Sequence, residues 1–318
     1  PRIVEHVAVN RAAGKSFNAQ ARAFVALDRY ITAHPDLNDG TLSRECVTGF
    51  IAQYASGAHS TSYLHSIATY VRGLAKHLLS VDVEAYVYPI SLLPRVSSRV
   101  PCIPTHDEVV AFMAHADGLI QAGGTWAMNT RAYAVALCLL YCCGMRVSEA
   151  FGLATGDVDT AAGKISIIHS KGDKDRDLWV PEGLAGMLGR DDALVSPLFP
   201  QRRFFLVGRD GYGINSRSFA IWMGREWRAR FQVGEGIRVP TPHSLRHAMV
   251  VRRVDLWGGE DSPDFGARLP ALSRFLGHCC AGTTMDYYHQ LRGHGQAVAK
   301  AIESGSGVAR EVLDALDL

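Results

Sequence analysis

The sequence has no apolar run that approaches the roughly 20 residues needed by a membrane-spanning helix. Its longest such run, from Ala132 to Cys143, is typical of a buried helix. The seven cysteines are odd in number and include two vicinal pairs, so they do not indicate a disulfide framework. No segment is typical of a secretory signal. These absences argue against membrane and secreted proteins, and we expect a protein of the reducing cytoplasm.

Two common kinds of site are also missing. Residues 13–16 read Ala-Gly-Lys-Ser and end like a P-loop, but Val9 stands where that motif requires its first glycine. His243 and His247 are four residues apart, yet the glutamate of a His-Glu-x-x-His protease is absent, and the chain has no Cys-x-x-Cys pair. We therefore expect no ATP site, no metal and no other cofactor.

Charge is sparse and nearly balanced overall, because charged residues make up 20% of the chain and the net charge is +2. Its distribution is uneven. Residues 201–253 contain eleven arginines against three acidic residues. Such a segment suits a partner lined with phosphates, although a solvated arginine-rich surface would have the same composition.

The first hundred residues predict short helices. Two apolar stripes with helical spacing indicate the first and the third of them, at Phe17, Ala21, Phe24, Val25 and Ile31, and at Tyr63, Ile67, Tyr70, Val71, Leu74 and Leu78. A middle helix is expected after Thr41, which would cap it. Arg72 and Lys76 share one side of the third helix, where they would face either DNA phosphates or solvent.

Residues 87–104 contain four prolines and refuse a helix. We therefore predict domains at 1–97 and 104–318, joined by a linker at 98–103. Thr105 and Glu108 form a capping-box pattern that opens the first helix of the second domain.

The second domain is predicted to be mostly helical with one hairpin. A helix through Ala132 should end at Cys143-Gly144, and another should begin at Val147. Residues 164–169 and 177–180 are β-branched or apolar and flank a polar turn, which predicts a β-hairpin. The expected fold class is mainly α with a small antiparallel β-sheet (α+β).

Several basic residues stand where a helix can aim them at an anion. Arg146 follows the glycine turn, and Glu149 lies one helical turn further on, where it would brace the guanidinium or form an ordinary surface pair. His243 and Arg246 follow a Thr-Pro cap and share a face of the first helical turn. His243 would move protons, and Arg246 would grip phosphate oxygens.

The remaining candidates lie at the hairpin tip and near the C-terminus. Neighbouring cations would lower the pKa of Lys171 and make it a usable acid, although a solvated turn would look the same. Gly277-His278 is typical of a helix end. Tyr287 stands nine residues after His278, with Tyr288 as a rival nucleophile. A phenol has a pKa near 10, so it needs cations and a base to become reactive.

The ordered set of these short motifs resembles the tyrosine recombinase (phage integrase) family over roughly the last two thirds of the chain. The motifs are Gly-Met-Arg146-Val-Ser-Glu, Ser-Lys171-Gly, His243-Ser-Leu-Arg246-His, Leu-Gly-His278 and Asp-Tyr287. The resemblance implies that Lys171 is the acid for the leaving 5′ hydroxyl, that His278 donates to the phosphate and that Tyr287 is the nucleophile. One departure is residues 258–264, which look like an inserted loop.

The resemblance further implies a C-shaped clamp on duplex DNA and a homotetramer on paired recognition sites. Cleavage would proceed through a 3′-phosphotyrosyl link and a Holliday junction without metal, in a protein associated with a prokaryotic nucleoid. The predicted DNA-binding residues are Arg72, Lys76, Lys174, Arg176 and Arg217. A C-terminal helix at 308–318 would dock on a neighbouring subunit, with packing in cis as the alternative. Two rival functions are a type IB topoisomerase and a non-catalytic DNA-binding regulator.

Overall fold

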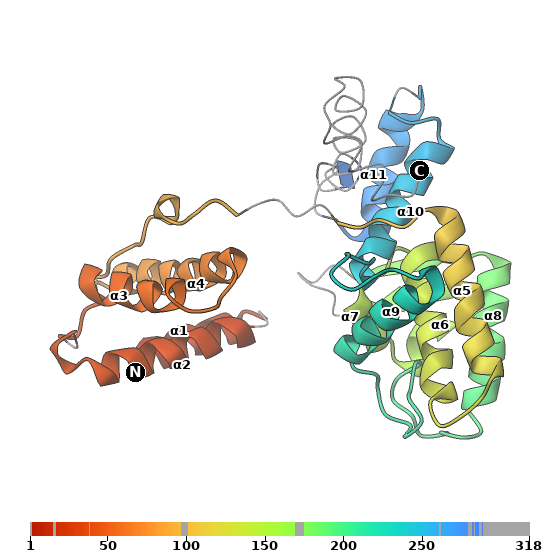
Figure 1. Cartoon of the computed structure of the whole chain (residues 1–318), viewed down its shortest axis with the longest axis horizontal. Helices are drawn as coiled ribbons and strands as arrows, with labels where there is room; N and C mark the ends of the chain where they lie inside the picture. The colour runs from red at the N-terminus through yellow and green to blue at the C-terminus, as the bar shows by residue number, and fades with distance from the viewer. Residues whose placement is uncertain are drawn as a thin grey trace. The chain divides into compact units, whose positions relative to one another are not determined.

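The structure is a computed structural model that describes residues 2–14, 17–37, 39–96, 101–168, 175–260, 262–278, 282, 284, 285 and 288. The chain divides into two compact units, Pro1–Arg99 and Val100–Leu318 (Figure 1). This division falls inside the predicted linker. Among the described residues, no helix is both long enough and apolar enough to cross a membrane.

The first unit is helical and has its own apolar core. Its helices are α1 (Arg2–Ala12), α2 (Asn18–Ala33), α3 (Arg44–Ala55) and α4 (Thr61–Ser80), and all four contribute to its packing. The predicted stripes are right in α4 except that Leu64 is buried in place of the exposed Tyr63. In α2, Leu27 is buried and Val25 is exposed.

The predicted cap of α3 was wrong. Ser43 is the N-cap, and its hydroxyl accepts a hydrogen bond from the Cys46 backbone at 3.2 Å. Thr41 instead bonds to the carboxylate of Asp39, through both its backbone N–H and its hydroxyl. The acidic side chain of Asp39 thereby stabilises the turn before the helix, and the helix begins two residues later than the prediction implied.

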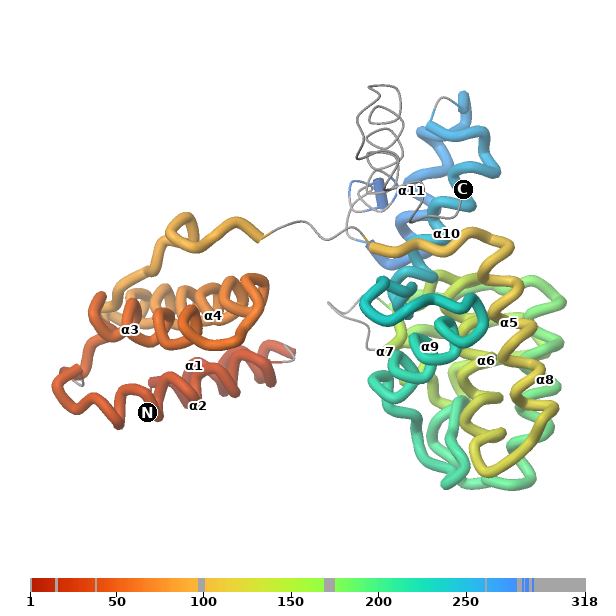
Figure 2. The backbone as a smooth tube through the Cα atoms, viewed as in Figure 1, coloured from red at the N-terminus to blue at the C-terminus, as the bar shows by residue number. Residues whose placement is uncertain are grey.

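The second unit is the larger of the two (Figure 2). It contains every β-strand among the described residues, and the first unit has an isolated β-bridge between Leu42 and Ala85. In order, its elements are α5 (His106–Gln121), α6 (Ala127–Cys142), α7 (Val147–Gly152), β1 (Val158–Asp159), β2 (Lys164–Ile167), β3 (Arg176–Trp179), α8 (Glu182–Val195), α9 (Ser216–Phe231), α10 (Pro242–Leu256) and α11 (Phe265–Leu276). The predicted capping box is present at the start of α5, with Thr105 and Glu108 bonded to each other's backbones.

The sheet is antiparallel, with β2 between β1 and β3. The predicted hairpin is therefore confirmed, with Lys164 opposite Trp179 and Ile167 opposite Arg176. Ile165, Ile167 and Leu178 face the core, and the alternate residues face outward, which is the period of a half-buried sheet. Because β1 is only two residues long, its sequence carries no strand pattern.

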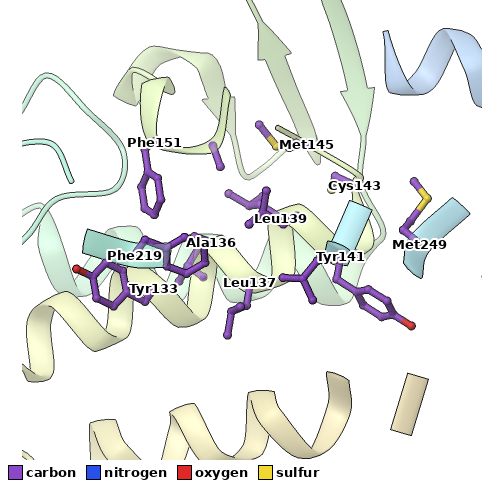
Figure 3. Close-up of a cluster of buried hydrophobic side chains, with 14 of the residues drawn as sticks. Tyr133, Ala136, Leu137, Leu139, Tyr141, Cys143, Met145, Phe151, Phe219 and Met249 are labelled. Carbon is purple, nitrogen blue, oxygen red and sulfur yellow. The ribbon is translucent and has the colours of Figure 1, made fainter. Parts of the chain in front are cut away.

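Helix α6 is the centre of the second core, as the apolar run predicted. It packs against α5 and α10, and its buried face includes Leu137, Leu139 and Leu140. Cys143 and Met145, which precede and follow Gly144 in the sequence, are both buried (Figure 3). Gly144 has φ +58°, so the chain turns sharply between two anchored side chains and leads directly into α7.

Helix α10 begins, and helix α11 ends, where the sequence predicted. Thr241 caps α10, with Pro242 in its first turn. Gly277 ends α11 with φ +70°, and the backbone N–H of His278 donates to the carbonyl of Ser273 at 2.9 Å. Residues 258–260 and 262–264 form turns between these two helices, which is where the sequence indicated an inserted loop.

Candidate functional site

Arg146 and Glu149 form the pair that the sequence predicted. Arg146 is the N-cap of α7, and its Nη1 donates to Oε1 of Glu149 at 2.6 Å. Its backbone N–H donates to Oε2 of the same carboxylate at 2.8 Å. The Arg146 side chain keeps 28% exposure, whereas that of Glu149 keeps only 5%. Glu149 therefore braces an arginine that still reaches solvent.

Glu149 also binds a second arginine. Arg176 donates from Nη1 to Oε1 at 3.2 Å and from Nη2 to Oε2 at 2.9 Å. Burial alone would raise the pKa of Glu149, but hydrogen bonds from Arg176 and Arg146 lower it below its ordinary value. We predicted Arg176 as a DNA-binding residue. In the structure its side chain is only 9% exposed and is engaged inside the protein.

Arg246 lies at the junction of three segments. Its Nη1 donates to the carbonyl oxygen of Gly144, and its Nη2 donates to that of Leu276 at 2.6 Å. The residue has 0% exposure. The prediction gave its guanidinium to phosphate oxygens, whereas in this structure the side chain joins the turn before Arg146 to the end of α11.

The ring of His278 is held on both nitrogens. Nη2 of Arg246 donates to Nε2 at 2.8 Å, and since arginine has no acceptor, Nε2 must be unprotonated. Nδ1 therefore carries the proton and donates to the hydroxyl of the buried Thr284 at 2.8 Å. The implied donation from His278 to a phosphate would require one of these two bonds to break.

Two further histidines lie beside Arg246 on α10. His243 and His247 stack edge to face, with their ring centroids 4.7 Å apart. His243 is exposed, and its pKa is lowered by partial burial and by the charges of Arg246 and Arg146. His247 is buried, which together with His243 and Arg246 lowers its pKa to about 4. A neutral, exposed His243 is able to accept a proton.

A pocket of about 450 Å³ opens beside Arg146. Its lining joins Arg146 and Glu149 to Ile167 and Ile168 of the hairpin and to Arg203. Arg203 is exposed, and its guanidinium lies 5.3 Å from the centroid of the Phe204 ring. Arg203, from the arginine-rich segment, is thus a second cation on the lining of this pocket.

Four of the predictions fall on parts of the chain that the structure does not describe. Lys171, Lys174, Tyr287 and the tail at 308–318 lie outside the described residues. Tyr288, the rival nucleophile, is described and is 2% exposed.

The other predicted DNA-binding residues divide by exposure. Lys76 and Arg217 are exposed on α4 and α9. Arg72 is half-buried, and its Nη1 donates to the carbonyl oxygen of Tyr88 within the first unit. Sequence reasoning missed Thr284 as the partner of His278, because a hydroxyl six residues away carries no spacing signal. It also missed Arg203 as a residue of the site, because Arg203 was counted only as one of the eleven arginines in residues 201–253.

Among the described residues, no group of three or more His, Cys, Asp or Glu side chains is arranged to hold an ion. The partly exposed guanidinium of Arg146 is suited to binding an anion.

We expect stability to fall as the pH drops from about 6.5 to about 4. Burial and nearby cations, chiefly Arg246, lower the pKa of His278 to about 4. Burial, His243 and Arg246 lower the pKa of His247 to about 4 as well. In the unfolded chain these two histidines have the ordinary pKa of 6.5, so they take up protons at a higher pH than in the folded protein. Protonation as the pH falls therefore favours unfolding. Urea midpoints at pH 7.5, 6 and 5 test this. The variant His247→Gln should show a shallower decline than the wild type, and an identical decline would contradict the assignment.

Gly277→Ala should destabilise the protein by about 1–2 kcal/mol for the left-handed conformation alone. An added Cβ would also lie 2.8 Å from Nη1 of Arg176, which Glu149 holds in place. The matched control is Gly266→Ala in the same helix, where a Cβ meets nothing within 4 Å and should stabilise by up to about 1 kcal/mol. Urea unfolding compares the two, and equal effects would show that the position of Gly277 is not special.

Sequence comparison decides the family. A model of the phage integrase family matches residues 104–294, which is more than half of the chain. The chain belongs to the phage integrase family. It is 31% identical over 238 residues to Tyrosine recombinase XerD of Mycobacterium tuberculosis, covering 70% of this chain and 69% of that protein. It is 33% identical over 325 residues to Tyrosine recombinase XerC of Rhodospirillum centenum, covering 95% and 86%.

The match to another relative, XerD of Mycobacterium leprae, spans 66% of that protein's length. Solved structures of the family share the fold. The XerH site-specific recombinase bound to a palindromic difH substrate has a TM-score of 0.63 at 17% identity, covering 90% of this chain and 79% of that one. A lambda integrase dimer bound to a core site also has a TM-score of 0.63, at 11% identity, covering 90% and 94%. The predicted fold class is confirmed.

Proposed function

We propose that this integrase-family protein is a site-specific tyrosine recombinase that cuts and rejoins duplex DNA. Tyr287 attacks the phosphorus, the bond to the 5′ oxygen breaks, and a 3′-phosphotyrosyl link stores the energy for rejoining. Two such exchanges pass through a Holliday junction. The reaction consumes no cofactor and uses no metal.

The observation that carries the proposal is the convergence of Arg146, Arg246 and His278 from three separate helical segments. Arg246 contacts both the turn before Arg146 and the end of α11, so the three groups are fixed relative to one another. His243 adds a neutral ring next to the same arginines. A phosphodiester under attack gains negative charge on its oxygens, and preorganised cations are the groups that stabilise it.

Each residue has a proposed role in the step. Arg146 binds a non-bridging oxygen, and Glu149 holds Arg146 in place. His243 accepts the phenolic proton of Tyr287, and Lys171 gives a proton to the leaving 5′ oxygen. Arg246 adds its buried positive charge beside the site and holds His278, which donates to the phosphate after one of its two present bonds breaks. The near-complete burial of Tyr288 supports Tyr287 as the nucleophile, because an enclosed phenol does not reach a DNA phosphate.

The proposed partner is double-stranded DNA with paired recognition sites, bound by a homotetramer. The XerH and lambda integrase structures that share this fold were solved with DNA bound. The first unit, with the exposed Lys76, is proposed to clamp one side of the duplex. Exchange of residues 308–318 between subunits and a location at the nucleoid belong to the same proposal.

Covalent capture from a library tests this function without requiring a particular recognition sequence. A random-sequence duplex library, nicked so that cleavage releases a short fragment, is incubated with the protein in excess EDTA. We expect adducts that survive denaturant, whose DNA has a blocked 3′ end and whose released strand has a 5′ hydroxyl that a kinase can phosphorylate. Sequencing the captured DNA should reveal inverted repeats. Absence of any adduct, or a link through a 5′ end, would contradict the proposal.

A further inference from the structure

Arg176 occupies a position that the proposed chemistry has not used. It is the first residue of β3 and comes five residues after Lys171 in the sequence. Its side chain is 9% exposed, and all three guanidinium nitrogens donate to acceptors within the protein. A residue so enclosed is not arranged to contact DNA.

The acceptors of Arg176 lie on two different elements of the site. Nη1 and Nη2 bind the carboxylate of Glu149 on α7, and Nε donates to the carbonyl oxygen of Phe275 at 2.9 Å. Phe275 is two residues before Gly277, the C-cap of α11, and His278 follows Gly277 directly. One side chain therefore joins the hairpin, the helix that carries Glu149 and the segment that carries His278.

The sharing of Glu149 also decides how Arg146 is held. Each carboxylate oxygen accepts one bond from Arg176 and one from Arg146, the latter from Nη1 and from the backbone. Among the described residues, Nη2 of Arg146 makes only a long contact of 3.5 Å, with the carbonyl oxygen of Gly277. Without Arg176, the carboxylate would be free to bind both arms of Arg146, as arginine and carboxylate readily do.

The site's charge balance points the same way. Glu149 contributes one negative charge between two guanidinium groups, so the cluster keeps a net positive charge next to the pocket. Removing Arg176 would leave one carboxylate to neutralise Arg146 entirely. The phosphate site would then lose both its geometry and its excess charge.

We propose that Arg176 is a positioning residue for the DNA-cleavage step, an inference that rests on the proposed recombinase function. By donating to both carboxylate oxygens of Glu149, it leaves Nη2 of Arg146 available to a phosphate oxygen. By holding the Phe275 carbonyl, it fixes the end of α11 and therefore His278. It acts through these residues and does not touch the DNA.

The test compares Arg176→Gln with the wild type on a captured suicide duplex. At saturating DNA we expect single-turnover cleavage to slow by about 100-fold, as small misplacements of catalytic groups do. The dissociation constant should change far less than the cleavage rate, because the DNA has many other contacts with the protein. Arg217→Gln is the matched control, since Arg217 is exposed on α9 and is proposed to bind a phosphate, a contact whose loss lowers the salt slope by about 0.9. Unchanged cleavage by Arg176→Gln at saturating DNA would overturn the inference, and so would a loss of affinity as large as that of Arg217→Gln.

Two measurements separate this inference from misfolding and from failure of the proposed function. If Arg176→Gln does not fold, Arg176→Lys is tested in its place. Lysine keeps the charge but cannot bind both oxygens of Glu149 at once, so this variant should show the same slow cleavage with normal binding. A crystal structure of whichever variant folds needs no activity: we expect both terminal nitrogens of Arg146 on Glu149. An unmoved Arg146 would contradict the inference even if the wild type formed no DNA adduct. Lack of a wild-type adduct bears on the proposed function alone.

Discussion

Tyr287→Phe should abolish the covalent DNA adduct while leaving DNA binding intact. Phenylalanine keeps the ring but lacks the oxygen that would attack phosphorus, so no phosphotyrosyl link can form. A phenol ordinarily has a pKa near 10, so the nucleophile depends on the cations of the site and on a base to become reactive. Denaturing gels with a nicked duplex measure the adduct, and fluorescence anisotropy measures the dissociation constant. This is the largest effect that the account predicts.

The adjacent tyrosine supplies the matched control for that experiment. Tyr288 is 2% exposed, so Tyr288→Phe removes a hydroxyl from the interior of the protein. We expect this variant to lose some stability and still form the adduct. If Tyr288→Phe lost the adduct and Tyr287→Phe retained it, the nucleophile would be misassigned, although the proposed reaction class would stand.

Arg146→Gln should slow cleavage by about 10²–10³-fold, which is the usual effect of removing one preorganised donor to developing negative charge. Arg146 is the partly exposed guanidinium of the site, held on one arm by Glu149. Glutamine can still bond to Glu149 but brings no charge to the phosphate. Single-turnover cleavage at saturating DNA measures the loss.

The remote control is Arg190→Gln, which removes an exposed arginine from α8. It should cleave at the wild-type rate and bind DNA nearly as well. Equal losses in the two variants would show that general positive charge, and not the place of Arg146, supports the reaction.

The second domain was predictable from sequence where local chemistry alone sets the structure. Thr105 with Glu108, Thr241 with Pro242, and the positive φ of Gly144 and Gly277 each depend on a few adjacent residues. The strand β1 is too short to carry a pattern. In the first domain, the cap at Ser43 was missed because Thr41 is an equally good hydroxyl, and only the local bonds to Asp39 decide between them.

The site was predictable as a set of residues but not as a network. Motif spacing indicated that Glu149 would brace Arg146, and the structure shows that bond. The same reasoning placed Arg176 and Arg246 against DNA. Both are enclosed, because each finds backbone carbonyls from segments about 30 to 100 residues away, and no pattern in the sequence reports such contacts. The partnership of His278 with Thr284 depends on the same tertiary arrangement.

Mass spectrometry of the trapped adduct shows directly whether Tyr287 is the residue that becomes linked to DNA. After nuclease trimming and proteolysis of the wild-type adduct, the account predicts one modified peptide, with a nucleotide joined through its 3′ phosphate to Tyr287. A nucleotide on Tyr288 or on any other side chain, or a complete lack of nucleotide-linked peptide from active protein, would contradict it.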